Sequence, residues 1–135
     1  MKKLILCGIL LSQLSGCALY ETYVQAKYDA NEYALINTIR TETDNADEFC
    51  STSQISTLKH DVALFANYAE LTPHNDNVAT ISKNMNTLVT EFYTKVNSEK
   101  SVSPAYCKAK ITTINSIAKQ VQTIIGKKPR WHYKN

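Results

Sequence analysis

The stretch Ser103–Gly126, SPAYCKAKITTINSIAKQVQTIIG, decides the fold, because its apolar residues recur every three to four positions. This spacing places them along one face of an α-helix. Ser103 offers a capping oxygen, Pro104 suits the first helical position, and Gly126 suits the end of the helix. The recurring positions are Cys107, Ile111, Ile114, Ala118, Val121 and Ile125. The stretch therefore predicts a long amphipathic helix.

Three earlier stretches show the same spacing and predict three more helices. They lie at residues 31–43, from the capping residues 51–53 to Leu71, and from Thr72 or Asp76 to Val96. The first helix could also begin as early as Leu19. Only three glycines occur in the chain, and its three prolines fall where helices are expected to start or stop. We therefore expect an all-α fold, a small four-helix domain in which short loops join antiparallel neighbours.

The amino terminus carries the pattern of a bacterial lipoprotein signal. Two lysines precede a short apolar run, which is followed by Leu14-Ser15-Gly16-Cys17. The run is shorter than the roughly 20 residues that a membrane-spanning helix requires. The pattern resembles the lipobox of bacterial lipoproteins, which implies that residues 1–16 are removed and that Cys17 carries lipid. Ala18, where aspartate would retain a lipoprotein at the inner membrane, implies the periplasmic face of the outer membrane. An ordinary secretory signal is the alternative.

Two cysteines remain for the domain once Cys7 leaves with the signal and Cys17 carries lipid. In an oxidising compartment we expect Cys50 and Cys107 to form a structural disulfide. The bridge would join the end of the first helix to the start of the fourth. It would close a loop of about 57 residues and restrict the unfolded chain by about 4 kcal/mol. A metal or catalytic role is not expected, because the three histidines form no cluster with these cysteines.

Length and charge predict one domain after the signal. We expect a lipidated tether at 17–30, which could include the start of the first helix, a helical domain at 31–126, and a basic tail at 127–135. The formal net charge of +3 falls to +1 without the two signal lysines, which gives no case for nucleic-acid binding. The tail mixes bases with Trp131 and could contact anionic lipid, lipopolysaccharide or an acidic partner. A disordered end is the alternative.

The sequence shows no motif for catalysis. It contains no glycine-rich phosphate loop, no nucleophile elbow and no paired-histidine metal motif. His60 and Asp61 are neighbours on an expected helix, so we expect them to point in different directions and to form no dyad. We therefore expect a binding protein that is not an enzyme and uses no cofactor, metal or small-molecule substrate.

The lipobox, the helical spacing and the placement of the cysteines form one combined pattern. Its landmarks are Cys17, Cys50 and Cys107, together with Tyr33-Ala34-Leu35-Ile36, Val62-Ala63-Leu64-Phe65-Ala66 and Phe92-Tyr93. This pattern resembles the PulS/OutS type pilotins of type II secretion systems over about residues 31–126. The resemblance rests on spacing and not on a signature motif. It implies a four-helix outer-membrane lipoprotein that binds the carboxy-terminal segment of a secretin and directs it to the outer membrane.

The resemblance also implies an apolar groove in which the secretin segment forms a helix. We expect this groove between the first and the final helix, although sequence does not separate groove from interior. Its expected residues are Ile36, Ile39, Phe92, Val96, Ile114, Ile117 and Ala118. Ile117 and Ile124 lie beside the main apolar face of the last helix and could belong to the core or to a groove. The alternative function is a phage- or plasmid-type exclusion or immunity lipoprotein, or an inhibitor of an envelope enzyme, because the anchor and the disulfide fit it equally well.

Overall fold

The structure is a computed structural model that describes residues 25–44, 51–99 and 101–131. Within these ranges the chain forms four helices and no strand. The helices are α2 (Ala30–Thr43), α3 (Thr52–Leu71), α4 (Asp76–Ser98) and α5 (Pro104–Gly126). The expected all-α class with four helices is confirmed, and the observed bounds agree closely with those expected from spacing and capping residues. Tyr28 lies ahead of α2, in the segment that leads into it.

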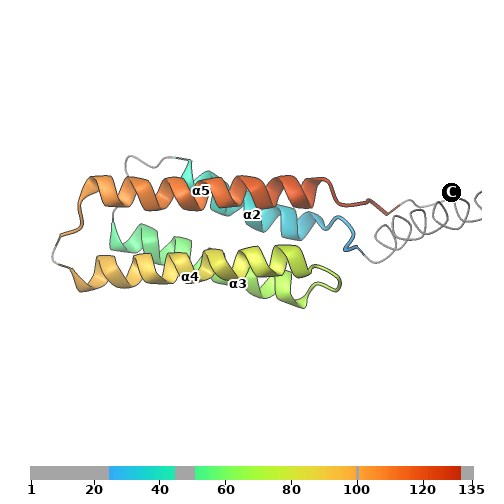
Figure 1. The fold of residues 1–135 in the computed structure, drawn as a ribbon, viewed down its shortest axis with the longest axis horizontal. Coiled ribbons are helices and arrows are strands. Elements are labelled where there is room, and N and C mark those ends of the chain that lie inside the picture. Colours follow the sequence, from blue (N-terminus) through green and yellow to red (C-terminus); the bar gives the residue numbers. More distant parts are fainter. Residues whose placement is uncertain (1–24, 45–50, 100, 132–135) are drawn as a thin grey trace, which may run out of the picture.

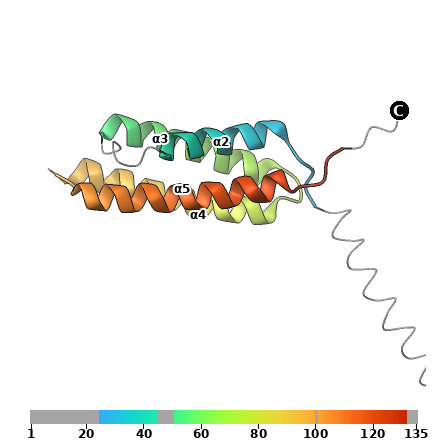
Figure 2. The same ribbon diagram turned by 90° about the horizontal axis from the view of Figure 1, so that it is seen from above.

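The four helices pack as a ring. Helix α2 packs against α3 and α5, and α4 packs against the same two helices, whereas the described backbones of the diagonal pairs, α2 with α4 and α3 with α5, lie further apart. Both described chain ends leave the bundle beside the α3–α4 turn, and the α4–α5 connection lies at the opposite end (Figures 1 and 2). We call the first end the terminal end (residues 25–32, 70–76 and 126–131) and the other the distal end (residues 99 and 101–103).

Local capping explains where three of the helices begin. The side chains of Asp29, Ser51 and Ser103 accept hydrogen bonds from backbone N–H groups in the first turns of α2, α3 and α5. Pro104 occupies the first turn of α5, where its missing N–H has no cost. Asn75 precedes α4 but makes no side-chain capping bond. Its amide is used in the interior instead, so the start of α4 is held by tertiary contacts.

The core consists of apolar side chains from all four helices. Fully buried aliphatic and aromatic side chains each contribute about 1.5–3 kcal/mol to folding, so these positions hold the bundle together. They are Ile36, Ile39, Ile55, Leu58, Val62, Phe65, Ala69, Val78, Met85, Val89, Phe92, Cys107, Ile111, Ile114, Ala118, Val121 and Ile125. Their spacing matches the apolar repeats of the sequence.

Cys107 is the only cysteine among the described residues. It is buried in the core with 2% of its surface exposed, and its side chain is not free. Cys17 and Cys50 lie outside the described ranges, so those ranges contain no pair of cysteines. Lipid on Cys17 and a bridge between Cys50 and Cys107 therefore stay predictions.

Candidate functional site

The structure places most of the expected groove residues in the core. Ile36, Ile39, Phe92, Ile114 and Ala118 are each 0% exposed. Val96 and Ile117 are half-buried. The five buried residues therefore do not line an open groove in this structure, and an aspartate at any of them would place a charge inside the bundle.

A polar network closes the interface where the groove was expected, between α2 and α5. The side-chain amide of Asn115 donates to the carbonyl oxygen of Arg40 (3.2 Å), to Thr43 Oγ1 (2.9 Å) and to Asp44 Oδ1 (3.1 Å). Two turns further along α5, Gln122 accepts from Arg40 Nη1 at 3.0 Å. Buried polar groups are normally hydrogen-bonded, because an unpaired one destabilises the fold. A shift of α5 along α2 would break these bonds, so the network fixes the register of the two helices. Hydrogen bonds between α2 and α5 therefore occupy the interface where the groove was expected.

Apolar side chains that are only half-buried lie instead along the seam between α4 and α5. They form two rows with a spacing of seven residues, which keeps each row on nearly one side of its helix. Each row ends in a half-buried lysine toward the distal end. We call the two rows, lysines included, the seam rows: Ile81, Leu88 and Lys95 on α4, and Lys110, Ile117 and Ile124 on α5. The four aliphatic members pack against the core while keeping part of their surface in solvent.

Tyr106 joins the two rows toward the distal end. Its ring centroid lies 4.8 Å from Lys95 Nζ and 5.6 Å from Lys110 Nζ, so both rows face the same seam. The ring also packs at 6.0 Å against buried Phe92, with its edge toward that ring. The seam is therefore apolar toward the terminal end and carries two lysines toward the distal end, of which Lys95 is also paired with Glu99 at 3.2 Å.

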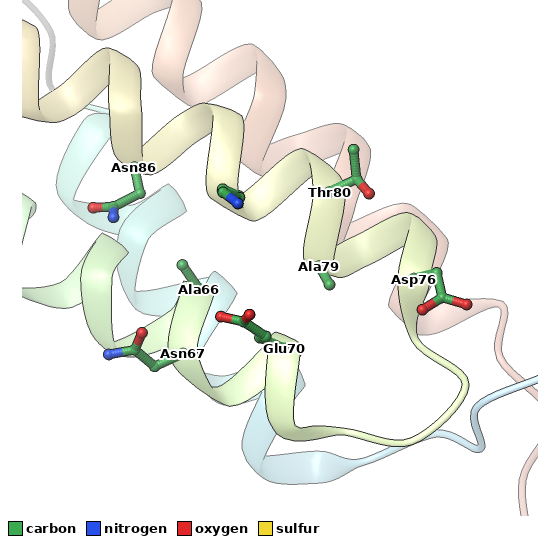
Figure 3. Close-up of a pocket in the computed structure, with 8 residues that line it drawn as sticks. Ala66, Asn67, Glu70, Asp76, Ala79, Thr80 and Asn86 are labelled. Atoms are coloured by element: carbon green, nitrogen blue, oxygen red, sulfur yellow. The ribbon is translucent and has the colours of Figure 1, made fainter.

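A concave surface lies between α3 and α4. It has a volume of about 420 Å³. Ala66 of α3 and Ala79 of α4 point into the space between the helices, and Glu70 reaches into it (Figure 3). The lining consists of Ala66, Asn67, Glu70, Asp76, Ala79, Thr80, Lys83 and Asn86. Its amides and mixed charges suit polar contacts, and the sequence pattern predicted a binding site at none of these residues.

An acidic pair lies where α2 meets α3. Burial, together with a hydrogen bond to Asp61 and its negative charge, raises the pKa of Glu42 to about 7. His60 Nδ1 lies 3.0 Å from Asp61 Oδ1, so the prediction that these two side chains point apart was wrong. The His60 side chain is 76% exposed, and the described residues contain no group of three or more side chains able to hold a metal ion. Of the pair Glu42 and Asp61, Glu42 therefore gains or loses a proton near neutral pH.

A buried charged cluster holds the terminal end together. Lys128 Nζ lies 2.5 Å from Glu32 Oε2 and 2.6 Å from Asn75 Oδ1. The Asn75 amide donates to Glu32 Oε1 at 2.6 Å and to the Ala69 carbonyl at 3.2 Å. The Lys128 and Glu32 side chains are 2% and 0% exposed. We call Glu32, Asn75 and Lys128 the buried lock, because it joins α2, the α3–α4 turn and the segment after α5.

Comparison of the chain with protein families, with curated proteins and with solved structures gave no match. None of the helices in the described ranges has the length and apolar character needed to cross a membrane.

Sequence reasoning missed the buried lock, although one signal for it was present. Glu32 continues the apolar spacing of Ile36 and Ile39 toward the start of the helix, which places a carboxylate on the buried face. A charge at such a position requires a buried partner. Nothing in the sequence of the basic tail distinguishes the buried Lys128 from the exposed Lys127.

Proposed function

We propose that this chain is a pilotin-type lipoprotein, which binds the carboxy-terminal segment of a type II secretion secretin and directs it to the outer membrane. The observation that carries the proposal is the pair of seam rows on α4 and α5, which offers apolar surface to a further helix. The lipobox pattern that ends at Cys17 supports the anchor, and the four-helix architecture agrees with the resemblance.

The seam rows match the dimensions of an amphipathic guest helix. Each row covers fifteen residues of its helix, or fourteen steps along it, from Ile81 to Lys95 and from Lys110 to Ile124. At 1.5 Å per residue this gives a length of about 21 Å, or about four helical turns. A guest with apolar residues three, four and seven positions apart can pack into the seam as a third helix. The two lysines favour a guest with an acidic group toward the distal end.

The proposed mechanism uses binding and needs no chemical step. A secretin tail that lacks its own core is disordered in isolation, and it orders when its apolar face is buried on the seam. The lipid on Cys17 then supplies the address, because several acyl chains hold a protein at a membrane far more firmly than one. A bridge between Cys50 and Cys107 would fix the start of α5, and with it the distal end of the seam.

The test measures binding of secretin carboxy-terminal peptides to the mature protein by fluorescence anisotropy, and the helix content of the bound peptide by circular dichroism. We expect Leu88→Asp and Ile117→Asp to weaken binding at least about tenfold, because each places a charge in the apolar seam. Matched controls are Thr90→Asp and Thr113→Asp, which add the same charge to exposed positions of the same helices.

The seam variants could lose their fold, so a surface variant accompanies them. Lys110→Glu reverses one charge at a half-buried position and removes no core contact. We expect it to weaken the binding of a peptide that carries an acidic group at its distal end. Equal peptide affinity in the folded seam variants and in their matched controls would overturn the proposed binding surface. Failure of every secretin tail to bind the wild-type protein would overturn the proposed function itself.

A further inference from the structure

Large apolar side chains are exposed at the terminal end of the bundle. Among the described residues only three large apolar side chains are exposed, and two of them, Leu71 and Trp131, lie at this end. Leu71, the last residue of α3, is 83% exposed, and Trp131, five residues after the end of α5, is 72% exposed. Exposed side chains of this size, gathered at one end, indicate a surface that contacts another apolar phase.

Cations and aromatic rings alternate around these side chains. Lys27 Nζ lies 6.0 Å from the centroid of the Trp131 ring, and Arg130 Cζ lies 4.3 Å from the centroid of the Tyr28 ring. Lys127 is exposed beside them. Tryptophan, tyrosine and basic side chains in this combination are typical of the boundary between a bilayer and water, where rings lie at the headgroups and cations contact phosphate.

The backbone holds this surface in place. The Ala26 N–H donates to the His74 carbonyl at 3.1 Å, and the Tyr28 N–H donates to the Pro129 carbonyl at 2.9 Å. The buried lock holds Lys128, which lies directly before Pro129 in the outgoing segment, in the interior. The backbone of the incoming and outgoing segments is therefore part of the folded domain.

Two of the four acids described at the terminal end are engaged elsewhere. Glu32 is paired with Lys128, and Asp29 caps α2 while it accepts a hydrogen bond from Tyr68 Oη at 2.7 Å. Glu70 and Asp76 are exposed, and both line the concave surface between α3 and α4. The segments that enter and leave the bundle therefore present positive charge.

The chain between the domain and its expected anchor is short. Gln25, the first described residue, follows Cys17 by eight residues, which span at most about 28 Å when fully extended. This step rests on the lipid anchor of the proposed function. An anchored domain would keep its terminal end within that distance of the bilayer.

We infer that the terminal end of the bundle is a docking surface for a bilayer with anionic headgroups. Trp131 and Leu71 enter the headgroup region, where an amphipathic ring and an aliphatic side chain are both stable. Lys27, Lys127 and Arg130 contact lipid phosphates. The bundle axis then points away from the membrane, which leaves the seam between α4 and α5 accessible along its length.

The test uses the mature polypeptide from residue 17 with Cys17→Ser, which cannot carry lipid. It measures co-sedimentation with vesicles of phosphatidylcholine alone or mixed with phosphatidylglycerol, and the emission of Trp131, the only tryptophan in the chain. We expect at least about tenfold stronger partition into the anionic vesicles and a blue shift of the emission. Binding should fall steeply in about 1 M salt, where the screening length is about 3 Å. Equal partition into both vesicles, or no partition, would overturn the inference.

A pair of double variants separates this inference from the proposed function. Lys27→Glu with Arg130→Glu should abolish vesicle binding and keep the affinity for a secretin peptide. Lys95→Glu with Lys110→Glu makes the same change of charge at the distal side, and should keep vesicle binding while it weakens binding of the peptide. Loss of vesicle binding in both double variants would show a response to net charge alone and would contradict a surface at the terminal end.

Discussion

The buried lock gives the sharpest prediction for stability. Replacing Lys128 with methionine keeps most of the volume of the side chain but removes the ammonium group that lies 2.5 Å from Glu32 Oε2. The carboxylate is 0% exposed, so water cannot replace the lost partner. Only the amide of Asn75, at 2.6 Å, remains bonded to it.

The cost follows from the burial of the remaining charge. Breaking a buried ion pair from one side costs about 3–5 kcal/mol, because an unpaired ion stays in the interior. A domain of this size has a free energy of unfolding of about 5–15 kcal/mol, so Lys128→Met removes a large share of it. Changing Glu32 to glutamine in the same chain removes the unpaired charge. We therefore expect Lys128→Met with Glu32→Gln to be more stable than Lys128→Met alone, by at least about 1 kcal/mol.

The assay is urea unfolding followed by circular dichroism, applied to the wild type, both single variants and the double variant. Lys127→Met serves as a matched control, because its side chain is exposed and its loss should change the free energy of unfolding by no more than about 0.5 kcal/mol. A double variant less stable than Lys128→Met alone would refute the reasoning. So would a cost of Lys128→Met no larger than that of the control.

Three further predictions concern pH, the α2–α5 interface and the cysteines. The pKa of Glu42 is raised from 4.5 to about 7, so between these pH values the folded protein holds a proton that the unfolded chain has released. The protonated Glu42 therefore contributes stability that is fully present below pH 4.5 and is lost as the pH rises through about 7. Glu42→Gln should therefore stabilise the protein at about pH 8, by about 1 kcal/mol after allowance for partial exposure, and an unchanged midpoint of urea unfolding would contradict this. Asn115→Ala should lower the free energy of unfolding by about 1–3 kcal/mol, since it leaves the buried Thr43 Oγ1 without its donor and removes the bonds that join α5 to the end of α2. A loss below about 0.5 kcal/mol in the same assay would contradict the network. Thiol labelling of the mature protein should find no free thiol before reduction and two afterwards. Reduction should lower the free energy of unfolding by up to about 4 kcal/mol. Labelling of Cys50 and Cys107 without reductant would exclude their bridge.

The helices of this fold could be predicted from sequence because their signals are local. Apolar spacing and capping residues act within a few turns of chain, so the start of α5 at Pro104 and the end of α3 at Leu71 could be read directly. Burial depends instead on which helices become neighbours. Ile114 and Ile117 are the same residue type three positions apart, yet the first is 0% exposed and the second is half-buried on the seam.

The candidate site was harder to predict because it consists of positions that a ring of helices leaves half-covered. The sequence placed a groove between the first and the last helix, where Asn115 and Gln122 close the interface by hydrogen bonds. An asparagine and a glutamine on one side of a helix could equally have faced solvent. Their burial depends on receiving partners from α2, which spacing within α5 does not reveal.

The two proposed surfaces constrain each other through the axis of the bundle. The seam rows run from Ile81 and Ile124 near the terminal end to Lys95 and Lys110 nearer the distal end, along helices that Figures 1 and 2 show nearly parallel to the long axis. If the terminal end lies on the membrane, a guest helix in the seam stands away from the bilayer, with its acidic group at the far side. While a guest is bound, its acidic group neutralises Lys95 and Lys110, and these lysines then have little attraction to anionic lipid. A guest that reversed its direction would place its acid among anionic headgroups, so the same arrangement selects one orientation of the bound segment.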